Sequence, residues 1–190
     1  MTLTTPATRA LVRSPWLACA LLTLPTAPAL AGNDFVTVAA AQCQAVDATV
    51  ALPADIEPYR SAVKACGLAR PAQPVKVRLV SVFTDDYYQH LPADAPWQRF
   101  PLPVLLDDTG RCLGRLPHLF PVDPPQELVV RAGQWRRGIP HELRLTVLSP
   151  TVGGNYRLPS LRWSTKAQAY QSKAPSSPHP IPLEDKTPCP

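Results

Sequence analysis

The residues best equipped for chemistry stand in one short stretch that follows an apolar run: Asp85, Asp86 and His90. Two carboxylates and an imidazole could hold a divalent cation or serve as general acid and base. Adjacent residues of a strand point to opposite faces, however, so the aspartates form a pair only where a turn reorients them. A solvated loop is therefore the preferred interpretation. A small periplasmic metal-dependent hydrolase that uses these residues is kept as the alternative function.

Other sets of reactive residues do not have the spacing of a catalytic or metal site. Residues 107–110, Asp-Asp-Thr-Gly, look like the start of a calcium loop but lack its spaced acidic pattern and its later glutamate, so a turn is expected. The four histidines are not at metal-ligand spacing, and the chain has no G-x-S-x-G motif or glycine-rich phosphate loop. We therefore expect no catalytic residue, no metal and no cofactor, and favour a protein that is not an enzyme over the hydrolase alternative.

Four of the five cysteines lie after residue 31 and indicate two disulfide bonds: Cys43, Cys66, Cys112 and Cys189. They contain no C-x-x-C motif and are too widely spread for a zinc ribbon. Four cysteines permit three connectivities, and the sequence does not decide among them. We favour Cys43–Cys66, which closes a local loop around a predicted helix, and Cys112–Cys189, which ties down the C-terminal tail.

Two predicted connections carry aromatic side chains beside charged ones, in residues 85–97 and 134–138. Aromatic residues and arginine are enriched where protein interfaces gain their binding energy. The competing interpretation is that the tyrosines cover a sheet edge and that the tryptophan of the second segment folds back onto the sheet. The sequence thus gives a candidate binding surface of five residues: Tyr87, Tyr88, Trp97, Trp135 and Arg136.

Residues 1–31 have the features of a secretory signal peptide. Arg9 and Arg13 precede a short apolar run, no acidic residue is present, and the segment closes on the small residues Ala29-Leu30-Ala31. The apolar run is shorter than the roughly 20 residues that span a bilayer. We therefore expect cleavage after Ala31, a periplasmic or secreted protein, and no membrane span after cleavage.

Cleavage would leave residues 32–190, with 17 basic and 14 acidic residues and a net charge of +3. These charges are spread along the chain and form no basic run of the kind that binds nucleic acid, so no nucleic-acid partner is expected. Residues 32–165 are long enough for one domain with its own core. Residues 166–190, rich in Pro, Ser, Lys and Gln, are predicted to be an extended proline-rich tail.

The pattern of apolar residues predicts a mainly β fold with one short N-terminal helix. A 3.6-residue period over residues 56–66, capped by Asp55 and stopped by Gly67, indicates that helix. Alternation and turn residues indicate strands over residues 35–38, 75–83, 100–106, 111–113, 126–131, 141–148 and 156–163. Because of Pro101 and Pro103, the strand at 100–106 must lie at an edge or contain a bulge. These elements favour an antiparallel β-sandwich, immunoglobulin-like or related, with two disulfides.

The function expected from these observations is protein binding. We expect an exported, non-catalytic protein that contacts another envelope or secreted protein in the bacterial cell envelope, as an accessory, inhibitor or immunity-type module. A structural role, with the tail as a spacer or docking peptide, is a further alternative.

Overall fold

The computed structural model of the protein describes residues 34–122, 126–149, 153–172 and 189. The predicted signal peptide, residues 1–31, and most of the predicted tail lie outside these residues. In the part of the chain that is described, no helix is long and apolar enough to cross a membrane.

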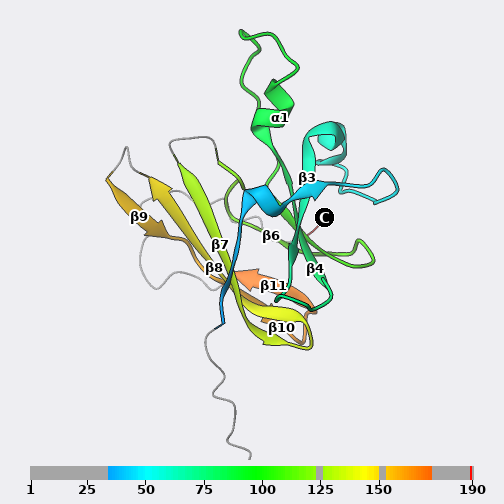
Figure 1. Ribbon diagram of the computed structural model, residues 1–190, viewed down its shortest axis with the longest axis vertical. Coiled ribbons are helices and arrows are strands. Elements are labelled where there is room, and N and C mark those ends of the chain that lie inside the picture. Colours follow the sequence, from blue (N-terminus) through cyan, green and yellow to red (C-terminus); the bar gives the residue numbers. More distant parts are fainter. Residues whose placement is uncertain (1–33, 123–125, 150–152, 173–188, 190) are drawn as a thin grey trace, which may run out of the picture. The chain divides into compact units, whose positions relative to one another are not determined.

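The described chain is mainly β and forms two antiparallel sheets (Figure 1). A six-stranded sheet has the order β1-β7-β8-β10-β11, with β9 also paired to β8. Its strands are β1 (Val36–Val38), β7 (Glu127–Arg136), β8 (Ile139–Ser149), β9 (Gly154–Arg157), β10 (Leu161–Ser164) and β11 (Ala169–Ser172).

A five-stranded sheet follows the order of the chain, β2-β3-β4-β5-β6. Its strands are β2 (Gln44–Ala45), β3 (Val63–Leu68), β4 (Val77–Val82), β5 (Val104–Asp107) and β6 (Cys112–Arg115). Helices within the described ranges are short: two 3₁₀ helices, η1 (Ala40–Gln42) and η2 (Glu57–Ala62), and one five-residue α-helix, α1 (Thr84–Tyr88).

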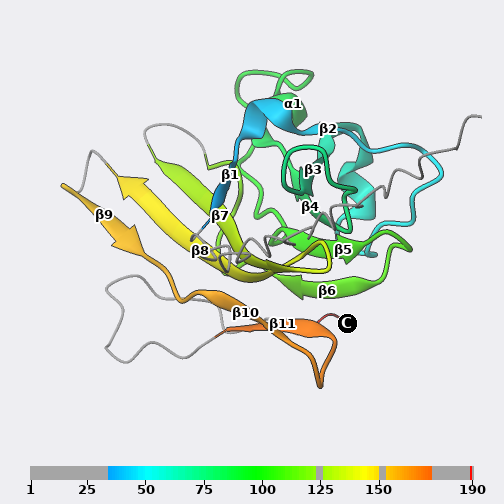
Figure 2. The ribbon, with the colours of Figure 1, turned by 60° about the horizontal axis from the view of Figure 1, so that its bottom comes forward.

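The two sheets face each other across one apolar core, which is a sandwich-like arrangement. Leu143, Leu145 and Val147 alternate along β8 and are buried, as the sequence predicts for this strand. Leu68 and Leu79 reach the same core from the five-stranded sheet. Figure 2 shows β11 running beside β6, where the two sheets also meet.

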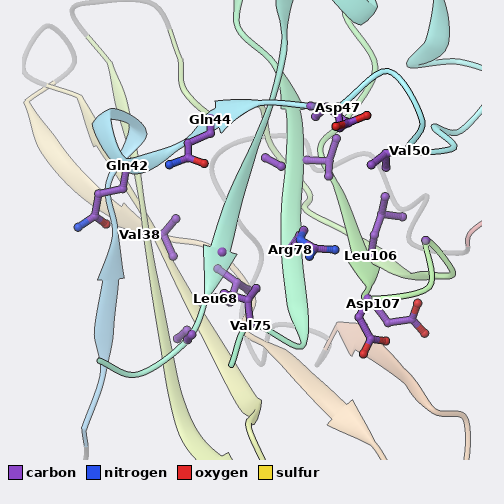
Figure 3. Close-up of a pocket in the computed structure, with 18 of the residues that line it drawn as sticks. Val38, Gln42, Gln44, Asp47, Val50, Leu68, Val75, Arg78, Leu106 and Asp107 are labelled. Carbon is purple, nitrogen blue, oxygen red and sulfur yellow. The ribbon is translucent and has the colours of Figure 1, made fainter. Parts of the chain in front are cut away.

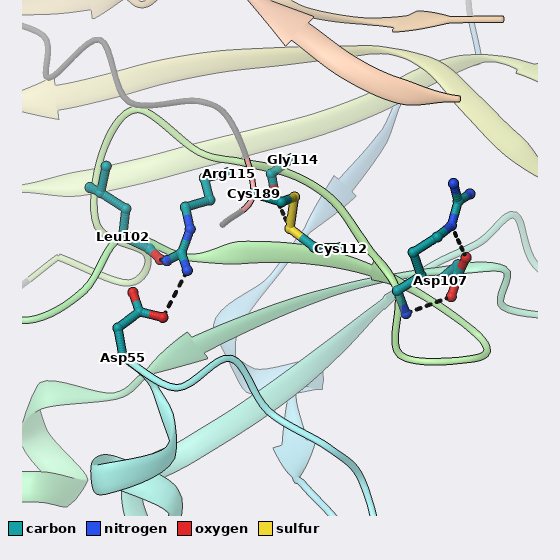
Figure 4. The surroundings of a disulfide bond; sticks show 8 residues. Asp55, Leu102, Asp107, Cys112, Gly114, Arg115 and Cys189 are labelled. Atoms are coloured by element: carbon teal, nitrogen blue, oxygen red, sulfur yellow. Dashed lines mark hydrogen bonds and ion pairs between the residues drawn. A yellow bond between two sulfur atoms is a disulfide. The ribbon is translucent and has the colours of Figure 1, made fainter. Parts of the chain in front are cut away.

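A second, smaller core covers the outer face of the five-stranded sheet. Ile56, Val82 and Val104 are buried there beneath η2 and α1. The segment before η2 is also held by charge, since Arg115 of β6 donates to Asp55 Oδ1 at 2.8 Å and to the Leu102 carbonyl at 2.8 Å (Figure 4). The outer face of this sheet is therefore covered only beneath η2 and α1, and the segment before η2 is held in place.

The structure joins Cys43 to Cys66 and Cys112 to Cys189, the pairing favoured from the sequence. The first disulfide connects the chain between η1 and β2 to the middle of β3. The second attaches the far end of the chain to β6 (Figure 4).

The structure does not show the helix predicted over residues 56–66, since residues 57–62 form only the 3₁₀ helix η2. Helical structure ends at Ala62, and residues 63–68 form β3, which pairs with β4 along its whole length. The apolar spacing fits both structures, but strand pairing and the disulfide at Cys66 decide in favour of β. Gly67, expected to end the helix, lies inside the strand opposite Arg78.

Two predictions near the C-terminus also need correction. Residues 169–172, assigned to the tail, form β11; Tyr170 is buried there and donates from its hydroxyl to the Pro140 carbonyl at 2.7 Å. The strand predicted over residues 156–163 is two strands, β9 and β10. A single buried aromatic residue among polar neighbours gave too weak a signal for β11.

The proline-containing strand at 100–106 begins only at Val104, after both prolines. It is not an edge strand, because it lies between β4 and β6. Its register with β6 shifts between Leu105 and Leu106, as at a β-bulge. The prediction of an edge position or a bulge is thus met by the bulge. The hairpin predicted around residues 107–110 joins β5 to β6.

Candidate functional site

Five aromatic rings gather beside α1, at one end of the outer face of the five-stranded sheet. We call them the aromatic cluster: Tyr59, Tyr87, Tyr88, Trp97 and Phe100. Phe100 lies at its base, 6% exposed, with its ring centroid 5.2 Å from Tyr87 and 5.4 Å from Tyr59. Its edge contacts with these rings have the geometry that aromatic pairs prefer.

Trp97 lies at the top of the cluster and is 68% exposed. Its ring stacks on Tyr88, with centroids 5.7 Å apart and planes 14° from parallel. The Tyr88 hydroxyl accepts a hydrogen bond from the backbone N–H of Gln98 at 2.8 Å. Tyr88 therefore holds both the indole ring and the backbone beside it, so Trp97 is presented to solvent in a fixed position.

Asp85, Asp86 and His90 lie in and directly after α1 but do not form a catalytic arrangement. Asp86 is ion-paired with Lys64 of β3 at 2.6 Å, and Lys64 also lies 4.6 Å from the ring centre of Phe83. Asp85 and His90 are exposed. Among the residues described, no three His, Cys, Asp or Glu side chains are placed to hold a metal ion.

Trp135 and Arg136 lie apart from the aromatic cluster, at the end of β7. Figure 1 shows α1 and the turn that joins β7 to β8 at opposite ends of the view. Arg137 and Gly138 form that turn, with positive φ angles of 51° and 81° that suit a tight hairpin. The Trp135 indole packs against the inter-sheet core and donates from Nε1 to the Asp34 carbonyl at 3.1 Å. The five predicted surface residues thus occupy two regions.

A groove of about 940 Å³ opens at the other end of the outer face of the five-stranded sheet (Figure 3). Its floor includes Gly67, Arg78 and Leu106, which are neighbours in register on β3, β4 and β5. One wall is the segment 42–51, and another is the turn 107–110 between β5 and β6. Sequence analysis did not find this groove, because its parts come from distant segments.

The walls of the groove are held by hydrogen bonds. Arg60 of η2 donates to the carbonyl oxygens of Asp47 at 3.2 Å and Val50 at 2.9 Å, which fixes the first wall. In the second wall, Asp107 accepts from Thr109 N–H at 3.0 Å and from Arg111 Nε at 3.0 Å.

Both wall aspartates hold their negative charge over a wide pH range. Hydrogen bonds from the backbone and the side chain of Thr49 lower the pKa of Asp47. At Asp107, burial acts to raise the pKa, but hydrogen bonds from Thr109 and Arg111 outweigh it and leave the pKa lowered. These carboxylates are thus engaged within their own turns.

The chain was compared with protein-family models, with curated proteins and with solved structures, and none of these comparisons found a match. The function of the chain is therefore inferred from its own geometry.

Proposed function

We propose that the protein is an exported, non-catalytic binding protein that contacts another protein of the bacterial envelope through the surface around Trp97. The observation that carries this proposal is the 68% exposure of an indole ring that stacks on Tyr88 and contacts the buried ring of Phe100. Tryptophan and tyrosine are frequent energetic anchors of interfaces, and a rigid anchor loses little conformational entropy on binding.

The surroundings of Trp97 support a protein partner. Leu91, on the same connection after α1, is 39% exposed, and these two are the large apolar side chains that stand exposed in the described residues. Tyr87 and Tyr88 are half-buried beneath them. An apolar centre of this kind with polar neighbours is the usual composition of an interface core and its rim.

Export is the second part of the proposal. Disulfide bonds form and persist in oxidising compartments, which agrees with the leader features of residues 1–31. We also propose that the sandwich-like pair of sheets belongs to a class related to, rather than identical with, the immunoglobulin fold. The consecutive order β2 to β6 supports this choice, since immunoglobulin domains use Greek-key connections.

The alternative of a metal-dependent hydrolase is not favoured by any observation. Asp86 is engaged by Lys64, and its neighbours in the sequence do not converge on it.

The test is affinity capture from envelope extracts, followed by titration of the purified partner. Wild-type protein should retain a stoichiometric partner, and Trp97→Ala should weaken its affinity by roughly thirtyfold, because an interface anchor contributes about 2 kcal/mol. Arg162→Gln is the control, since it removes an exposed side chain of β10 that belongs neither to the aromatic cluster nor to the groove. Equal affinity of Trp97→Ala and wild type would contradict the proposal.

A further inference from the structure

The edge of β3 is only partly covered by β2. All six residues of β3 pair with β4, but only Lys64 and Ala65 pair with β2. Beyond Ala65, the chain that would continue β2 turns away into η1, where Gln42 N–H donates to the Ala39 carbonyl at 3.0 Å. The last part of β3 therefore has a free edge, and this edge lies in the groove.

The hydrogen-bond pattern of the sheet shows which backbone groups face this edge. Phe83 N–H donates to the Ala62 carbonyl, and Val46 N–H donates to the Val63 carbonyl. Along an antiparallel strand, the backbone N–H and C=O groups of successive residues point to opposite neighbouring strands. These groups therefore face β4 at Ala62 and at every second residue after it, and they face β2 at Val63 and at every second residue after it. The N–H and C=O of Gly67 thus point to the β2 side, with no partner strand in the described part of the chain.

Gly67 is exposed, but the space above its Cα is taken by Val75, since a Cβ atom at Gly67 would lie 2.9 Å from Val75 Cγ2. Glycine at this position therefore lets Val75 pack against the strand while the backbone of Gly67 stays exposed. The groove volume of about 940 Å³ is within the range of ligand sites, roughly 300–1,000 Å³. Its floor and walls are lined by apolar side chains, among them Val46, Val50, Val75, Val80 and Leu106.

Arg78, on the floor beside Gly67, supplies a charge. Figure 3 shows its side chain within the groove, between Asp47 and Asp107. Within the described ranges Arg78 has no hydrogen bond or ion pair, whereas the other lining arginine, Arg70, is paired with Asp34 at 2.7 Å. A guanidinium with open donors is a strong binding group for a carboxylate.

We propose that the groove binds an extended peptide segment of another protein. The segment pairs its backbone with Gly67 on the free edge of β3 and places a carboxylate on Arg78. Main-chain pairing at a sheet edge supplies affinity in this mode of recognition, and side-chain contacts supply selectivity. This site shares no residue with the aromatic cluster, so the proposal can be tested independently of the function proposed for Trp97.

The first test uses a phage-displayed library of random peptides, selected on the full chain with both disulfides intact. Selected peptides should contain aspartate or glutamate, or bind through a free C-terminal carboxylate. Fluorescence anisotropy of the synthesised peptides should show an affinity loss of roughly tenfold or more for Arg78→Gln. Arg162→Gln, which removes an exposed arginine of β10, is the matched control and should change nothing.

Asp108, exposed at the tip of the turn 107–110, gives a test of the sign of the ligand charge. Asp108→Asn should leave the affinity unchanged or raise it, because it removes a negative charge near an anionic ligand. A basic peptide that binds more weakly to Asp108→Asn and more tightly to Arg78→Gln would overturn the proposal.

Amide hydrogen exchange tests the backbone pairing directly. The Gly67 amide should exchange fast in the free protein and become protected when a selected peptide binds. Protection already present in the free protein would mean that the chain itself covers this edge, and it would overturn the proposal. Recovery of no peptide, or of peptides whose binding is lost in Trp97→Ala but kept in Arg78→Gln, would overturn it as well.

Discussion

The aromatic cluster and the groove lie on the same face of the same sheet, yet they offer a partner different interactions. The cluster presents a fixed, exposed indole ring, so contact there gains energy by removing apolar surface from water. The groove presents a free strand edge and the guanidinium of Arg78, so contact there gains energy from hydrogen bonds and charge. The two proposed recognition surfaces therefore lie on one sheet, and the loss of binding at each can be measured separately.

The largest expected effect comes from the base of the aromatic cluster. Phe100→Ala removes a ring that is 6% exposed and contacts four other aromatic rings. The expected loss is about 3–5 kcal/mol of the free energy of unfolding, because the cavity cannot be filled by its neighbours. Urea denaturation followed by circular dichroism measures it. A loss below about 1 kcal/mol would show that the rings rearrange and that Trp97 is not rigidly held.

The second prediction concerns the disulfide beside the groove. Replacing both Cys43 and Cys66 by serine should lower the free energy of unfolding by about 2–4 kcal/mol, since the unfolded chain is no longer cross-linked. Because the residues on either side of both cysteines line the groove, its wall should also loosen, which faster amide exchange of residues 42–46 would report. Binding at Trp97 should be unchanged. Equal loss of binding at both surfaces would contradict the separation of the two regions.

The third prediction is a pH dependence in the turn 107–110. The folded-state pKa of Asp107 lies below its ordinary value of 3.8. Its contribution to stability is therefore fully present above that value and is lost as the pH falls through the lower folded pKa. Asp107→Asn should cost about 1 kcal/mol at neutral pH and reduce the loss of stability below pH 3.8. Denaturation curves from pH 2 to 7 test this, and identical pH profiles would contradict it.

The smallest expected effect on stability is at Trp97 itself. Trp97→Ala removes a side chain that is 68% exposed, so the free energy of unfolding should change by no more than about 0.5 kcal/mol. Thermal unfolding of the variant and wild type is the measurement. A much larger loss would mean that the indole ring is there to hold the loop, and it would weaken the case for a binding surface.

Much of the β structure could be predicted because local patterns and tertiary packing agree. β8 shows strict alternation, and β5 and β6 flank a turn rich in aspartate and glycine. The structure also has the cysteine pairing that was favoured among the three that the sequence allows. Where the local pattern fits two structures, as over residues 56–66, the outcome depends on strand partners that sequence spacing does not reveal.

The aromatic cluster can be recognised in the sequence, whereas the groove cannot. Tyr87, Tyr88 and Trp97 stand close together in the chain, so their cluster leaves a local signal. Trp135 and Arg136 give the same kind of signal but lie in another region. The groove joins segments from residue 36 to residue 135, and its free edge arises from where β2 stops, so no local pattern could have indicated it.

The most direct test of the central claim is a calorimetric titration of the captured partner into wild-type protein, Trp97→Ala and Arg162→Gln. We predict that the dissociation constant rises by roughly thirtyfold for Trp97→Ala and stays near the wild-type value for Arg162→Gln. An unchanged dissociation constant for Trp97→Ala, in a variant that folds normally, would contradict the claim that this surface binds the partner.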